Sequence, residues 1–170
     1  MIVNTTRFGT VEIAEDKLIS FPFGLPGFDE QKQWCVLHTD GHPGVHWLQS
    51  VDDSEVALLI ADPEQLFPDY DVTVQDTDLA CIGVVIDDTT TEPPPVVMRV
   101  VLSVERLKGV VTANLRAPIL IHLEKRLAVQ IPLTSGNYSV RQPLPKSEER
   151  APKKPETKPG MEQLLVATGS

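Results

Sequence analysis

Short runs of alternating apolar and polar residues recur along most of the chain, separated by turn-forming residues. Alternation with a period of two puts successive side chains on opposite faces, so each run predicts a half-buried strand. Such runs cover residues 2–8, 11–13, 17–21, 34–38, 45–51, 70–74, 83–86, 96–104, 118–123 and 127–133. The continuous apolar run within 55–61 instead predicts a central strand.

Helical signals are few and short. Asp62 followed by Pro63 is typical of a helix start, and another proline soon afterwards limits that helix to about one turn. A second short helix is expected within 76–82. The Pro/Gly-rich stretch 22–28 predicts a structured loop held to the core by its own apolar residues, and 87–95 predicts an exposed loop.

Strand signals at roughly ten-residue spacing, with only one or two short helical turns, predict an all-β fold. We expect a small antiparallel β-barrel-like or sandwich domain over residues 1–144. Residues 145–170 are rich in proline and charge, which predicts a disordered tail. Within that tail, Leu164-Leu165-Val166 could form a small docking helix, but the preferred interpretation is that it makes no stable contact.

The acidic residues are unevenly distributed. Residues 33–98 contain thirteen Asp and Glu residues and no Lys or Arg. A folded surface of this sign repels nucleic acid, because binding phosphates needs cationic side chains. It also attracts basic proteins and speeds their encounter. The pattern therefore indicates a binder of a basic protein, with simple solubility as the alternative.

The chain has 170 residues and two cysteines, Cys35 and Cys81, far apart in sequence. That spacing matches neither a disulfide framework nor a CxxC site, so two buried free thiols are expected. No apolar run approaches the roughly 20 residues needed to cross a bilayer, and no signal peptide is recognisable. The chain is expected to be soluble and cytoplasmic, without membrane contact.

No catalytic, cofactor-binding or metal-binding residue is predicted. Asp52 and Asp53 are adjacent at a strand end, where such residues usually shape a turn. His38, His42 and His46 recur every four residues, but the glycines and prolines between them prevent a helix that would align them. A small hydrolase that uses carboxylate pairs remains the unfavoured alternative.

Specific strings in the sequence resemble one family. They include Thr6-Arg7-Phe8-Gly9, Asp62-Pro63 and Phe67-Pro68-Asp69-Tyr70, and the other matching stretches are 21–28, 47–53, 112–119, 130 and 138–144. Together, and in this order over residues 2–144, they are similar to the FliW family of flagellar assembly factors. Each string is weakly specific alone, whereas the set is highly specific.

The resemblance implies a non-catalytic protein that binds the C-terminal region of flagellin. It also implies binding to CsrA, a basic regulator that represses flagellin mRNA translation, and antagonism of its RNA binding. A chaperone for flagellin without a CsrA partner is the alternative, and an exposed sheet edge would permit a homodimer. Combining charge with aromatic anchors, we expect the partner-binding residues to be Asp52, Asp53, Asp69, Tyr70, Asp71, Asn114 and Arg116.

Overall fold

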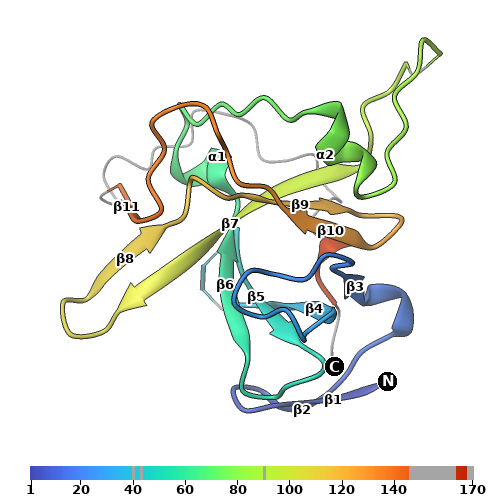
Figure 1. Cartoon of the computed structure of the whole chain (residues 1–170). Coiled ribbons are helices and arrows are strands. Elements are labelled where there is room, and N and C mark those ends of the chain that lie inside the picture. The colour runs from blue at the N-terminus through green and yellow to red at the C-terminus, as the bar shows by residue number, and fades with distance from the viewer. Residues whose placement is uncertain (40, 43, 90, 146–163, 168–170) are drawn as a thin grey trace.

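The computed structural model describes residues 1–39, 41–42, 44–89, 91–145 and 164–167. Strands dominate this part of the chain, and helical segments are short (Figure 1). The elements are β1 (Ile2–Thr5), β2 (Gly9–Glu12), η1 (Glu15–Lys17), β3 (Ile19–Ser20), β4 (Gln33–His38), β5 (Val45–Ser50), β6 (Ala57–Ala61), α1 (Pro63–Leu66), α2 (Asp76–Ala80), β7 (Val96–Glu105), β8 (Val110–Ala113), β9 (Ile119–His122), β10 (Leu127–Gln130) and β11 (Gln142–Pro143).

Seven strands form a closed ring. Strands β7, β6, β5, β4, β3, β10 and β9 are hydrogen-bonded in this order, and β9 pairs back with β7. All these pairings are antiparallel except β3 with β10, which run parallel. A separate hairpin of β1 and β2 packs at one end of the ring (Figure 1).

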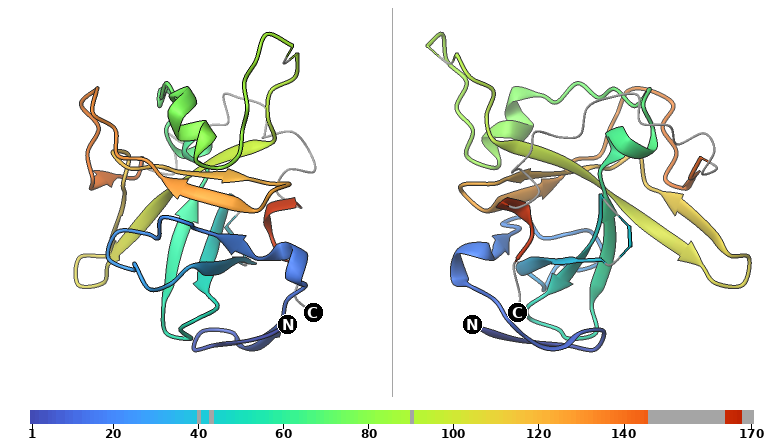
Figure 2. Two further views of the ribbon diagram at one scale, coloured as in Figure 1. Left: turned by 45° about the vertical axis from the view of Figure 1, so that its right-hand side comes forward. Right: turned by 180° about the vertical axis from the view of Figure 1, so that it is seen from behind.

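The long strand β7 organises the sheet. Its first half pairs with β9 and its second half pairs with β8, while β6 pairs with its centre. Beyond the ring, β7 and β8 continue as a hairpin that projects from the body in both views of Figure 2. The two-residue strand β11 adds to the outer edge of β8.

Apolar side chains fill the interior of the ring. Trp34 and Phe21 are both fully buried there, with their rings edge to face and 6.1 Å between centroids. A second apolar cluster lies where α1 and the following segment cover β7 and β8, and it includes Leu66 and Leu102. This second cluster positions the candidate site described below.

The predicted all-β antiparallel class with short helical turns is confirmed, and β6 is a central strand as expected. Two predicted strands are wrong. Residues 70–74 and 83–86 are not strands. In the second of these segments the Val84 amide is used in the turn after α2, where it donates to the Leu79 carbonyl at 3.0 Å. Strands β8 and β11 were not predicted; β8 is a strand through its pairing with β7, and β11 through its pairing with β8.

Two further expectations need correction. Both cysteines are free, but only Cys35 is buried; Cys81 is exposed on the last turn of α2. Most of the segment predicted to be disordered lies outside the described residues. Within it, Leu164–Ala167 packs against the ring, and Leu165 is fully buried. The expectation that this group makes no stable contact is therefore wrong.

Candidate protein-interaction site

A short acidic segment follows β6. Helix α1 begins there because the Asp62 carboxylate accepts a hydrogen bond from the Glu64 amide at 3.0 Å, with Pro63 at the first helical position. After one turn the chain leaves the helix and continues to Tyr70. We call the exposed carboxylates of this segment the acidic rim: Glu64, Asp69 and Asp71.

Tyr70 lies between two acids of the rim but faces inward. Its hydroxyl donates to the Leu115 carbonyl at 2.8 Å, and its ring packs edge to face with Tyr138, 4.9 Å between centroids. Burial raises the pKa of Tyr70 above its ordinary value, and the neighbouring Tyr138 adds to the rise. With 7% of its surface exposed, Tyr70 holds the segment in place. Its predicted role as a partner-binding anchor stays a prediction.

Further hydrogen bonds connect the rim to two other loops. The Tyr138 hydroxyl donates to the Asp71 carbonyl at 2.7 Å. The Leu115 amide donates to the Ser139 carbonyl at 3.0 Å. Three segments that are distant in sequence therefore meet here, and the backbone of the rim is fixed from two sides.

Asn114 and Arg116 flank the residue that Tyr70 contacts. The Asn114 side-chain oxygen accepts hydrogen bonds from the amides of Arg116 and Ala117, each at 3.1 Å. This arrangement is a turn stabilised by an Asn side chain. It leaves the Arg116 side chain exposed near the acidic rim.

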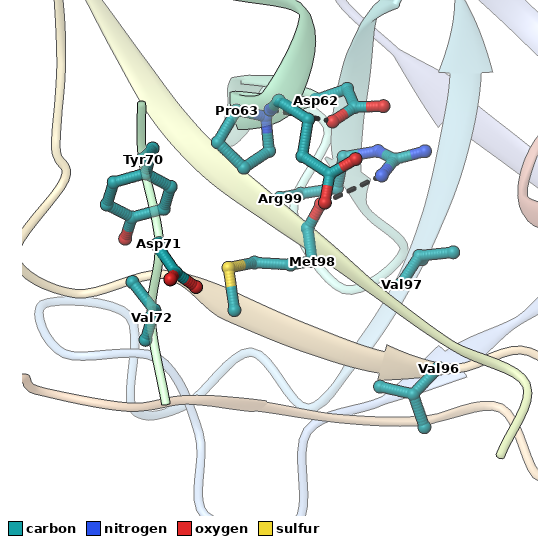
Figure 3. A pocket seen from close by; sticks show the side chains of 10 residues that line it. Asp62, Pro63, Tyr70, Asp71, Val72, Val96, Val97, Met98 and Arg99 are labelled. Carbon is teal, nitrogen blue, oxygen red and sulfur yellow. Dashed lines mark hydrogen bonds between the residues drawn. The ribbon is translucent and has the colours of Figure 1, made fainter. Parts of the chain in front are cut away.

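A shallow cavity of about 190 Å³ opens beside the rim (Figure 3). It lies between α1, the segment at Asp71 and the first half of β7. The Arg99 side chain lines it, 1% exposed, and donates to the Met98 carbonyl at 2.8 Å. Small-molecule sites usually occupy roughly 300–1,000 Å³, so this cavity is smaller than a usual small-molecule site. Three acidic residues line this cavity, Asp62, Glu64 and Asp71, and the Asp62 carboxylate caps α1.

Asp52 and Asp53 lie elsewhere. The Asp52 carboxylate accepts hydrogen bonds from the amides of Lys32 and Gln33 at 3.2 and 3.3 Å, and Asp53 accepts one from Glu55 at 2.9 Å. The Asp52 carboxylate holds the start of β4, whereas Asp53 shapes the turn before β6, as the sequence indicated. The rim follows the other end of this five-residue strand, roughly 15 Å away along it. Asp52 and Asp53 therefore do not belong to the acidic rim.

The three histidines do not come together at one site. His38 and His46 face each other across β4 and β5, with 6.2 Å between their ring centroids. His42 is exposed in the turn between those strands. Over the parts of the chain that the structure describes, no group of three potential ligands could hold a metal ion.

Sequence reasoning missed a second recessed surface, a groove of about 320 Å³ across β5, β6 and β7. Residues directly opposite one another on the three strands form its floor: Trp47, Leu59 and Leu102. Arg7 lies at its margin, with the guanidinium carbon 4.1 Å from the Trp47 ring centroid. No periodic signal reveals a contact between residues this far apart in sequence.

A family model described as FliW protein matches residues 2–144. The chain belongs to the FliW family.

Curated relatives of the family are named flagellar assembly factor FliW. The protein of Syntrophus aciditrophicus is 34% identical over 149 residues, which cover 88% of this chain and 90% of the relative. The protein of Thermotoga neapolitana is 32% identical over 151 residues, covering 88% and 97% of the two chains. Resemblance therefore extends over nearly the whole length of these relatives.

A solved structure agrees. The crystal structure of the flagellar assembly factor FliW superposes with a TM-score of 0.74 at 30% identity, covering 86% of this chain and 99% of that one. The FliW fold is thus shared, and the ring of strands belongs to the family. Across the described ranges, no helix has the length and hydrophobicity to span a bilayer.

Proposed function

We propose that this FliW-family chain is a non-catalytic flagellar assembly factor of the cytoplasm. It binds flagellin through the C-terminal region of flagellin. It also binds CsrA and antagonises its RNA binding, which relieves repression of flagellin mRNA translation. Membership of the FliW family carries the flagellar role, and the acidic rim supports a basic protein as the second partner.

The charge distribution supports an antagonist of an RNA-binding protein. Such an antagonist has to attract a cationic surface and repel the transcript bound to it. The stretch 33–98, which holds the whole acidic rim, contains no Lys or Arg in its sequence. The rim is also fixed in position by buried Tyr70, so little ordering is needed when a partner binds.

We narrow the proposed CsrA face to the acidic rim and the turn beside it. Asp69 and Asp71 are exposed on the rim, and Asn114 and Arg116 lie on the adjoining turn. We leave Asp52 and Asp53 out of this face, because their carboxylates accept backbone hydrogen bonds at the other end of β6.

Calorimetry against purified flagellin and CsrA, separately and together, tests the proposal. We expect the double variant D69K/D71K to bind CsrA at least about tenfold more weakly, because close interfacial charge pairs contribute more than 1.4 kcal/mol. The matched control is D88K/E92K, which makes the same charge change at exposed residues of the loop before β7. That control should retain most of the affinity.

Three results would contradict parts of the proposal. If both double variants lost the same CsrA affinity, the effect would come from net charge and not from the acidic rim. Unchanged CsrA affinity in folded D69K/D71K would exclude the rim as the face. Binding to flagellin but never to CsrA would leave only the flagellin chaperone.

A further inference from the structure

The described C-terminal segment, residues 164–167, lies beside β3, β4 and β10 (Figures 1 and 2). Leu165 is fully buried in the same core cluster as Ile19 and Trp34. Ala167 is 4% exposed and belongs to the neighbouring cluster, with Cys35. We call this place the tail slot.

The slot exists because β3 is only two residues long. Its register pairs Ile19 with Trp34 and Ser20 with Gln33. If β3 extended backward, Lys17 would pair with Val36, but residues 15–17 form η1 instead. The edge of β4 at Val36 is therefore free of β3, and the Ala167 amide donates to the Val36 carbonyl there at 2.8 Å. This contact is the start of strand addition at a sheet edge.

Arg126 joins the segment to the slot. Its guanidinium donates to the carbonyls of Lys17 at 2.7 Å and Leu18 at 3.3 Å on one side. On the other side it donates to the carbonyls of Leu164 at 2.7 Å and Leu165 at 3.4 Å. These contacts involve only backbone carbonyls, so Arg126 would bind any peptide whose backbone follows the same course. Selectivity comes from the buried leucine.

The segment lies outside the residues that the family model matches, because that match ends at residue 144. It is held by one buried leucine, one backbone amide and one guanidinium. These are the contacts that a bound peptide would make.

We propose that the tail slot is a docking site for a short apolar peptide and that Leu164–Ala167 occupies it as a detachable intramolecular ligand. The peptide class has leucine followed two positions later by a small residue, with a backbone that can pair with the β4 edge. Because the segment is covalently attached, its effective concentration at the tail slot is high, and an outside peptide has to compete with it. The chain's own segment therefore regulates the binding of outside peptides to the tail slot. This inference is independent of the proposed function.

The test uses the full chain and a labelled synthetic peptide with the sequence of residues 161–170. In the variant Leu165→Asp, a charged side chain cannot enter the apolar slot, so the segment is released. We expect saturable peptide binding, by fluorescence anisotropy, at least about tenfold tighter than to the unaltered chain. The matched control is Leu164→Asp: Leu164 is 50% exposed, so this variant should keep the segment docked and bind the peptide as weakly as the unaltered chain.

Hydrogen exchange on the unaltered chain provides a second measurement should Leu165→Asp fail to fold. The Ala167 amide should exchange by local opening, faster than the amides shared between β4 and β5. Exchange of Ala167 only with global unfolding would overturn the proposal, as would absence of peptide binding by folded Leu165→Asp. A dimer of the unaltered chain that dissociates in Leu165→Asp would assign the slot to a second copy and also overturn it.

Discussion

At the scale of single residues, the polar contacts of the acidic rim fall into two kinds. Tyr70 donates its hydroxyl within the buried core to Leu115, whereas Tyr138 makes an exposed contact to Asp71. Water can replace a lost partner only at the exposed contact. The two tyrosines therefore contribute differently to the stability of the same surface.

Replacing Tyr70 by Phe should lower the free energy of unfolding by about 1–2 kcal/mol, because the buried Leu115 carbonyl loses its side-chain donor. Urea denaturation measures the change. The matched variant is Tyr138→Phe, which removes a hydroxyl with similar geometry at the exposed Asp71 carbonyl. We expect it to cost less. A larger loss in Tyr138→Phe than in Tyr70→Phe would contradict this account of the rim.

Local chemistry made several residues predictable and long-range contacts made others unpredictable. Asp62 as a helix cap and Asp53 as a turn residue depend on partners two positions away, which the sequence displays. Tyr70 depends on Leu115, 45 positions later. Nothing nearby in the sequence distinguishes an inward tyrosine between acids from an exposed one.

At the scale of elements, local sequence pattern predicted some strands, whereas others depend on pairing with distant segments. Strand β7, with ten residues, and strands β4 and β5, with six each, carry clear β-branched or alternating patterns. The four residues of β8 become a strand through pairing with β7. The apolar run 83–86 is irregular because the chain turns there after α2. Its periodicity could not reveal that no neighbour pairs with it among the described strands.

Substitution of Gly24, in the loop between β3 and β4, should cost more stability than substitution of Gly9, the first residue of β2. Gly24 has φ +70, and an added Cβ would lie 3.3 Å from Asp29 Cα. Gly9 has φ +69 with open space around it. Both Ala substitutions should cost about 1–2 kcal/mol for the left-handed backbone. Gly24→Ala should cost roughly 1 kcal/mol more, because Asp29 has to move. Equal losses in urea denaturation would reject close packing of this loop.

At the scale of the whole molecule, the surface charge and the fold depend on different features of the sequence. The excess of acids over residues 33–98 says nothing about how the ring closes, yet it sets the sign of the surface that partners meet. Closure depends on the pairing of β9 with β7 and of β10 with β3, which involve segments far apart in sequence. The sign of the surface was therefore predictable, whereas the separation of Asp52 and Asp53 from the rim required the fold.

The salt dependence of CsrA binding tests the role of that surface. Raising the salt from roughly 0.05 to 0.5 M shortens the Debye length from over 10 Å to under 5 Å. We expect the association rate to fall by about tenfold or more, because steering by the exposed rim is screened. The dissociation rate should change less, since apolar contacts control it. In D69K/D71K the association rate should start low and vary less with salt than in D88K/E92K. An association rate of the unaltered chain that does not respond to salt would exclude electrostatic attraction as the means by which this protein finds a basic partner.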